Sequence, residues 1–109
     1  MTSIDDQAVA AYAISKSNGF WDDEVTVHFL LSKIALLQSE GSELLEAIRK
    51  EQGDEAILHE MADVYIRLID MFQGMRASGW LPYDASLDQA IASKMAINAG
   101  RPRKHGNLA

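Results

Sequence analysis

The sequence lacks cysteine, which excludes a disulfide framework, a thiolate nucleophile and a zinc site built on cysteine. The same absence fits a reducing compartment, so we expect a cytoplasmic protein. Proline occurs only twice, and aromatic residues make up 7% of the chain. Both prolines, Pro82 and Pro102, fall where helices are expected to end, so proline does not interrupt helix formation elsewhere.

Basic residues are also scarce, with 10 Lys and Arg against 16 Asp and Glu and a net charge of -6. This charge repels a phosphate backbone, so we do not expect nucleic acid as a general partner. No apolar run is long enough to span a bilayer, and residues 1–13 lack the basic and apolar regions of a secretory signal. We therefore expect neither a membrane partner nor a cleaved leader.

The residues that are present indicate one globular, helical domain over residues 1–109. The composition is 48% hydrophobic and 24% charged, which is ordinary for a folded protein. A chain of this length buries a small fraction of its surface, so association with further copies is expected. The expected helices cover residues 4–17, from the Asp22-Asp23 step to about 49, from Asp54 to 77, and from the Ser86/Gln89 capping box to Gly100. A basic tail, 101–109, follows.

Two pairs of acidic residues fall on the apolar faces of the second and third expected helices. At 100° per residue, Glu43 lies about 60° from Glu40, and both bearings are surrounded by leucine and alanine. Asp63 lies about 60° from Glu60 on the next helix, again among apolar residues. Glu46 is about 120° from Glu40 and is expected to face solvent, or at most to act as an outer ligand. The four carboxylates are thus predicted to face the core.

The short connection over residues 50–54 makes these two helices antiparallel neighbours. Each acidic pair lies at a similar distance along the chain from this connection, so all four carboxylates are expected at similar height. Converging carboxylates repel one another unless a divalent cation neutralises them. Oxygen ligands favour Mg²⁺, Mn²⁺ or Ca²⁺, and availability favours Mg²⁺, which commonly shares substrate phosphates. One pair alone would be typical of a solvated helix face, but two matched pairs favour a metal site.

A second group of polar residues belongs to the fourth expected helix. Lys94 and Asn98 are four residues apart on one face, and Arg101 follows in the tail. These donors suit phosphate and sugar oxygens, and they concentrate positive charge in an otherwise acidic chain. Either an ion pair or a phosphate contact would explain Lys33. For Arg67 we expect an ion pair with Asp63, four residues earlier. Trp21 is expected to pack on the core rather than stack on a base.

At these residues the sequence resembles the MazG-like branch of the all-alpha nucleotide pyrophosphohydrolases. The resemblance rests on Glu40-x-x-Glu43, on Glu60-x-x-Asp63 and on a C-terminal Lys94-x-x-x-Asn98-x-x-Arg101 segment, and it covers residues 19–106. It implies a four-helix core that assembles into a homodimer or a dimer of dimers, with sites near subunit contacts. It further implies Mg²⁺, or Mn²⁺ in its place, on the four carboxylates.

The activity that the resemblance implies is hydrolysis of a (deoxy)nucleoside triphosphate to the monophosphate and pyrophosphate, serving to remove unwanted nucleotides. One carboxylate, for which we take Glu43, would act as the catalytic base for the attacking water, although the spacing alone does not select it. A related alternative is a phosphoribosyl-ATP pyrophosphohydrolase, which would keep the metal and the leaving group. An alternative of another class is a helical interaction module whose acidic face binds a basic partner without chemistry.

Overall fold

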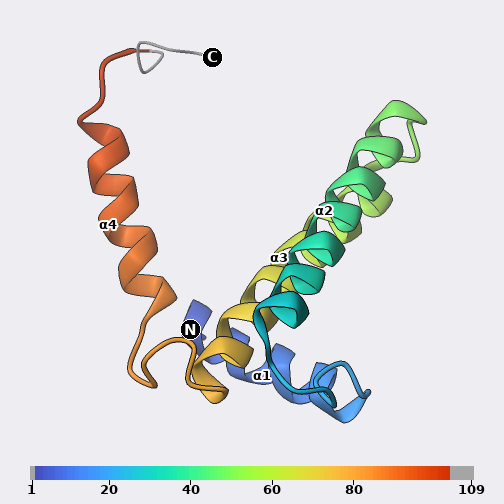
Figure 1. Cartoon of the computed structure of the whole chain (residues 1–109). Coiled ribbons are helices and arrows are strands. Elements are labelled where there is room, and N and C mark those ends of the chain that lie inside the picture. Colours follow the sequence, from blue (N-terminus) through green and yellow to red (C-terminus); the bar gives the residue numbers. More distant parts are fainter. Residues whose placement is uncertain (1, 104–109) are drawn as a thin grey trace.

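A computed structural model describes residues 2–103, which form four α-helices and contain no strand (Figure 1). The helices are α1 (Ile4–Ser17), α2 (Val27–Arg49), α3 (Asp54–Ala77) and α4 (Leu87–Ala99). The prediction of an all-helical chain is therefore confirmed for this part of the protein. None of the four helices is long and apolar enough to cross a membrane.

Polar residues fix the starts of three helices. The side chains of Ser3, Thr26 and Ser86 each accept a hydrogen bond from the backbone N–H three residues later, which caps α1, α2 and α4. The predicted start of the second helix at the Asp22-Asp23 step was therefore too early, because Thr26 is the residue that caps α2. Asp54 is the first residue of α3 rather than its cap, and Gly53 precedes it with φ 101°.

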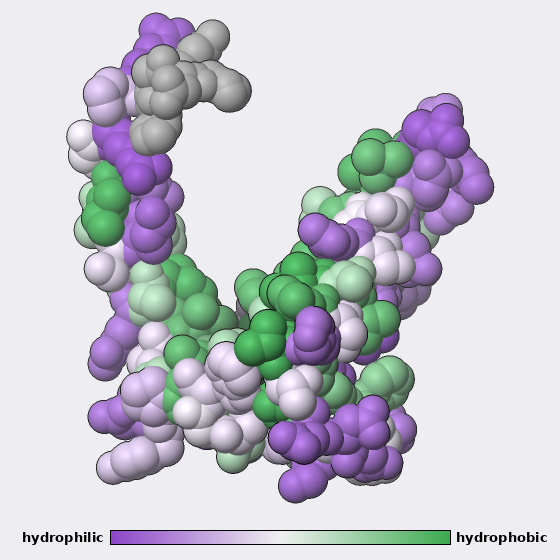
Figure 2. Space-filling view, viewed as in Figure 1, coloured by the Kyte–Doolittle hydropathy of each residue, from purple (hydrophilic) through white to green (hydrophobic). Residues whose placement is uncertain are grey.

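Helices α2 and α3 form the antiparallel hairpin that the sequence predicts, and they lie side by side along most of their length (Figure 1). The connection turns through two residues with positive φ, Glu51 and Gly53. Helix α1 packs against the other end of α3, where Ala8, Ile69 and Phe72 form the buried core. Figure 2 shows apolar side chains gathered around the junction of the helices and hydrophilic ones at the tip of the hairpin.

Trp21 closes the core from the segment between α1 and α2. Its side chain is buried, its ring lies against Gly74 of α3, and its indole N–H donates to Asp70 at 2.9 Å. The expectation that Trp21 packs rather than stacks on a base agrees with this position. Trp80, after α3, donates in the same way to the carbonyl of Val25 at 2.9 Å. The two tryptophans therefore connect α3 and the segment after it to the segment before α2.

Helix α4 stands apart from the hairpin as a separate arm, and none of its residues is buried (Figure 1). Its main helix contact is with α1, through a reciprocal pair of caps. The Asp5 carboxylate accepts from the Ser86 hydroxyl at 2.6 Å and from the Leu87 amide at 2.8 Å. The Asp88 carboxylate accepts in turn from the Ile4 and Asp5 amides at 3.2 and 2.8 Å. Two helix N-termini, each carrying partial positive charge, are thereby neutralised together.

Replacement of Asp5 with alanine is expected to destabilise the fold by about 1–2 kcal/mol at neutral pH, because α4 loses its charged cap. Burial alone would raise the pKa of Asp5, but its hydrogen bonds from Ser86, Asp88 and Leu87 outweigh burial and bring the pKa below 3.8. A lowered folded-state pKa stabilises the fold above the unfolded value, near 3.9, and this contribution is lost as the pH falls through the folded value.

Urea unfolding at neutral pH and at decreasing pH below about 4 checks this prediction. The difference between the wild type and Asp5→Ala should shrink over that acidic range. Asp6→Ala is the matched control, because Asp6 is exposed in the same helical turn and its carboxylate makes none of the α4 hydrogen bonds. An equal loss of stability in the two variants would contradict the role given to Asp5.

Candidate metal centre

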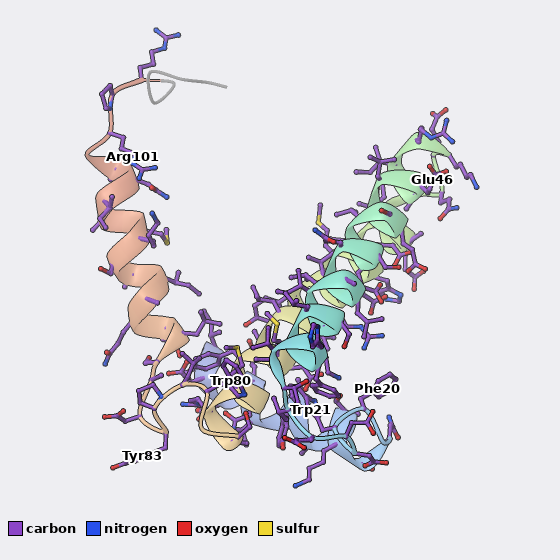
Figure 3. The ribbon with its side chains drawn as sticks, in the orientation of Figure 1. Phe20, Trp21, Glu46, Trp80, Tyr83 and Arg101 are labelled. Atoms are coloured by element: carbon purple, nitrogen blue, oxygen red, sulfur yellow. The ribbon has the colours of Figure 1, made fainter. Side chains whose placement is uncertain are left out.

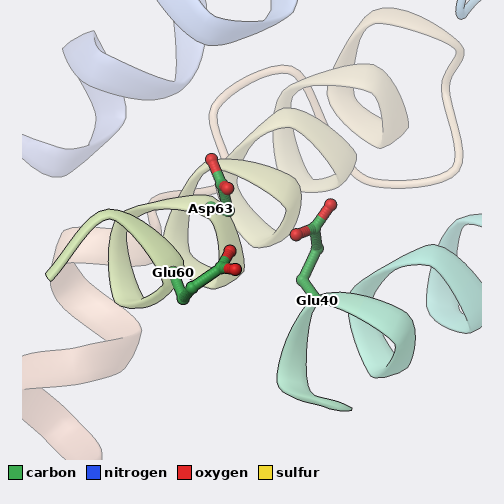
Figure 4. Close-up of side chains that lie close together, drawn as sticks. All are labelled: Glu40, Glu60 and Asp63. Carbon is green, nitrogen blue, oxygen red and sulfur yellow. The ribbon is translucent and has the colours of Figure 1, made fainter. Parts of the chain in front are cut away.

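Three carboxylates from two helices converge near the middle of the hairpin (Figure 4). Glu40 comes from α2, whereas Glu60 and Asp63 come from successive turns of α3. One oxygen from each side chain lies within 4.8 Å of the other two. Because the hairpin is antiparallel and its connection is short, residues at similar distances from the turn meet across the interface, as the spacing predicts.

Glu40 is the most enclosed member of this group, with 15% of its side chain exposed. Its Oε1 accepts from the Nε of Arg67 at 3.4 Å. Its Oε2 is buried and has no hydrogen-bond partner among the described residues. A buried carboxylate oxygen without a partner is unfavourable, so this atom identifies the place where a cation would be most stabilising.

Glu43 is exposed beside Glu40 and does not belong to this group of described residues, so three of the four predicted carboxylates converge rather than all four. The prediction that all four face the core is wrong for Glu43 and Asp63, which are both exposed. The negative charge of the neighbouring Glu40 is the main cause that raises the pKa of Glu43, with smaller increases from burial and from Asp63. Burial raises the pKa of Glu60, and the charges of Glu43 and Asp63 raise it further. Both shifts have the direction expected where several negative charges share one site, and one nearby arginine does not neutralise them.

The donor set suits a hard divalent cation. All of the converging atoms are carboxylate oxygens, the ligand type that Mg²⁺ and Mn²⁺ prefer, and they come with an unpartnered oxygen on Glu40. These oxygens are close enough to bind one cation, or two neighbouring cations, after small side-chain rotations. Glu40, Glu60 and Asp63 therefore fit the metal that the sequence predicts, whereas Glu43 lies outside their group.

Arg67 does not pair with Asp63, as was predicted from their spacing along α3. It reaches across to Glu40 of α2, and its guanidinium lies 5.3 Å from the centre of the Phe20 ring. Contact with an aromatic face favours this orientation of the guanidinium. The prediction considered only the geometry of a single helix, in which an i,i+4 pair is the nearest charged partner. The segment before α2, which carries Phe20, changes that outcome.

Lys33 serves the fold rather than an ion pair or a phosphate contact. Its side chain is buried, and its Nζ donates to the carbonyl of Phe20 at 2.6 Å. The ammonium also lies over the rings of Trp21 and Phe29, at 4.4 and 5.0 Å from their centres. Burial lowers the pKa of Lys33, although the charge of Asp70 acts in the opposite direction. Lys33 thereby holds the segment that carries Phe20, and Phe20 lies beside Arg67.

The predicted substrate donors belong to the arm and not to the hairpin. Lys94 and Asn98 are exposed on α4, and Arg101 follows at the far end of that arm (Figure 3). The structure does not bring these three residues to the carboxylates within one chain. The part of the predicted basic tail from residue 104 to 109 lies outside the described residues. Glu46 pairs with Arg49 and Lys50 near the tip of the hairpin, and it lines a hollow together with Glu43 and Glu60.

Two hollows flank the carboxylates. A cleft of about 690 Å³ is lined by Glu40 and Asp63 together with residues of α1, and a smaller hollow of about 350 Å³ is lined by Glu43 and Glu60 together with polar residues of the hairpin. The cleft was not predicted, because it depends on how α1 crosses α3. Comparisons of the chain with protein-family models, curated proteins and solved structures found no match.

Proposed function

We propose that this protein is a Mg²⁺-dependent pyrophosphohydrolase of nucleoside triphosphates, with Mn²⁺ as an alternative metal. The observation that carries the proposal is the convergence of Glu40, Glu60 and Asp63 from two helices, with an unpartnered buried oxygen on Glu40. Burial of an unpaired carboxylate oxygen is unfavourable on a solvated acidic face, whereas in a metal site the cation compensates for it. The motif spacing that resembles MazG-like enzymes supports the same assignment.

In this proposal Glu40, Glu60 and Asp63 hold the metal, and Glu43 completes the set from its edge. The metal, when bound, supplies positive charge that orients a triphosphate and makes its phosphorus more electrophilic. Glu43 is the group that we assign as base, because it is exposed and lines the polar hollow, where water has access. Glu43 accepts a proton from the attacking water, and the water oxygen forms a bond to the α-phosphorus. The bond from the α-phosphorus to the oxygen that bridges it to the β-phosphoryl group breaks, so pyrophosphate leaves with that oxygen and the nucleoside monophosphate is the second product.

The proposed enzyme works as an assembly of identical chains. Every residue of α4 except Leu87, Asp88 and Ile91 is exposed, and apolar side chains such as Met95 on the arm and Leu58 on the hairpin are 66% and 62% exposed. A second copy covers the exposed arm and the exposed hairpin at once, because each copy carries both elements. In such an assembly, Lys94, Asn98 and Arg101 of one copy are available to contact the substrate of another.

Addition of Mg²⁺ is expected to raise the melting temperature of the wild-type protein by about 5 °C or more when the metal exceeds its dissociation constant about tenfold. Glu60→Gln should lose this increase, whereas Glu55→Gln should keep it, because Glu55 is an exposed acid in the first turn of the same helix. In the presence of a chelator, Glu60→Gln should melt no lower than the wild type, since it removes one of the repelling charges.

The interaction-module alternative makes the opposite prediction. If the acidic face only binds a basic partner, Mg²⁺ does not selectively raise the melting temperature. In that case the protein also releases no pyrophosphate from any nucleoside triphosphate. Both results together would overturn the proposal that this is an enzyme. A panel of triphosphates that includes phosphoribosyl-ATP separates the two enzyme alternatives, because they share the metal and the leaving group and differ only in the substrate.

A further inference from the structure

The larger cleft begins at the carboxylates and continues between α1 and α3. Glu40 and Asp63 line it together with apolar residues of both helices, among them Ala10, Ile14 and Ile66. Its volume of about 690 Å³ lies within the range of sites for small molecules, which are usually apolar with a few well-placed polar groups. The cleft is therefore a cavity of ligand size that shares two of its wall residues with the candidate metal centre.

The polar groups in this cleft include one that has no partner. The Oγ of Ser15 is buried and makes no hydrogen bond among the described residues, although it lies in a helix whose carbonyls are near. Asn18 lines the same cleft at the end of α1 with an exposed amide side chain. A buried hydroxyl without a partner costs free energy that a bound ligand recovers. The unpartnered atoms of Ser15 and Glu40 are thus both in residues that line one cavity.

An aromatic ring and a guanidinium complete the lining. Phe20 and Arg67 lie against each other on one side of the cleft, and Arg67 also bonds to Glu40. Arg67 therefore connects the metal centre to the cleft, with its remaining N–H groups available as donors. Lys33 holds Phe20 in place through the backbone carbonyl, as described above. This wall is consequently held by the part-buried hydrogen bonds of Lys33 and Arg67.

We propose that this cleft binds the nucleoside part of the substrate, with Ser15 and Asn18 hydrogen-bonding to the edge of the base. The inference rests on the proposed function, because it takes the triphosphate to lie at the carboxylates. A nucleobase has apolar faces and a polar edge, which match apolar walls that carry a few amide and hydroxyl groups. Inorganic polyphosphate would leave these apolar walls without a ligand. Ser15 and Asn18 are thereby assigned as specificity-determining residues.

The test is the binding of nucleoside monophosphates to the full-length protein in the presence of a chelator, measured by titration calorimetry and by amide NMR shifts. At least one base is expected to bind and to shift the amides of Ser15 and Asn18. Ala10→Phe, which fills the cleft from an exposed position on α1, should weaken that binding about tenfold or more. Ala13→Phe is the matched control, because Ala13 is exposed on the same helix and does not line the cleft.

A second variant addresses specificity. Ser15→Ala should change the ratio of kcat/KM between the best and the worst base by about tenfold, whereas a residue that only stabilises the fold would leave this ratio unchanged. Equal binding by Ala10→Phe and Ala13→Phe, or no binding of any monophosphate, would overturn the assignment of the cleft. A change in oligomeric state in Ala10→Phe alone would also overturn it, because a second copy would then occupy the cavity.

Failure of this inference is distinguishable from failure of the proposed function. If triphosphates are hydrolysed but Ser15→Ala does not change the ratio of kcat/KM between bases, the proposed pyrophosphohydrolase activity is retained. The cleft is then rejected as the nucleoside site. Monophosphate binding that Ala10→Phe abolishes, without hydrolysis of any triphosphate, would support the cleft and reject the enzyme.

Discussion

Asp63→Asn is expected to lower kcat for the proposed triphosphate hydrolysis by about a thousandfold or more, because it replaces a charged ligand of the proposed metal with a neutral amide. The same exchange should preserve the helical content, since Asp63 is exposed and contributes to no buried contact in the core. Single-turnover release of pyrophosphate, together with circular dichroism, separates the loss of chemistry from a loss of fold.

Glu55→Gln controls for the removal of one negative charge from α3, and it should retain the activity of the wild type. Glu43→Gln should resemble Asp63→Asn in rate but not in metal affinity, because Glu43 is assigned mainly to proton transfer. Activity in Asp63→Asn equal to that of Glu55→Gln would mean that the converging carboxylates do not carry the reaction.

Gly74→Ala is expected to destabilise the fold by about 3 kcal/mol, which corresponds to a fall in melting temperature of about 10 °C or more. A Cβ at this position would lie 2.0 Å from an atom of the Trp21 ring, so either the ring or α3 has to move. Because Trp21 is buried and bonds to Asp70, the ring has little freedom to retreat. Thermal and urea unfolding measure this effect directly.

Gly41→Ala is the matched control, since Gly41 also lies inside a helix but a Cβ there would meet nothing within 4 Å. This change is expected to stabilise the protein by about 0.5–1 kcal/mol, because alanine favours helix more than glycine does. If Gly74→Ala proved as stable as Gly41→Ala, the packing of Trp21 on α3 would be wrong.

The hairpin and its acidic group were predictable from the sequence because both depend on local geometry. Helical periodicity places Glu40 on one face of α2 and Glu60 and Asp63 on one face of α3, and the short connection brings those faces together. The end of α3 at Ala77 was predicted to the residue and its start to within one residue, whereas the start of α2 was misplaced because several polar residues near Thr26 compete as caps.

The surroundings of the site were not predictable in the same way, because they depend on contacts between segments far apart in the chain. Arg67 bonds to Glu40 of the other hairpin helix instead of Asp63, and Phe20, more than forty positions earlier, lies beside its guanidinium. Lys33 donates to the carbonyl of the same Phe20, which lies 13 positions earlier in the chain. The cleft beside the carboxylates and the separate arm of α4 likewise follow from the positions of α1 and Asp5, which helical periodicity does not determine.

The most direct test of the proposed metal-dependent enzyme is phosphorus NMR of the products formed from canonical and damaged nucleoside triphosphates, with Mg²⁺ and with a chelator. We predict pyrophosphate and the nucleoside monophosphate in equal amounts, formed only with the metal and lost in Asp63→Asn. Orthophosphate as the product, or pyrophosphate formed equally well by Asp63→Asn, would contradict the role of the three converging carboxylates.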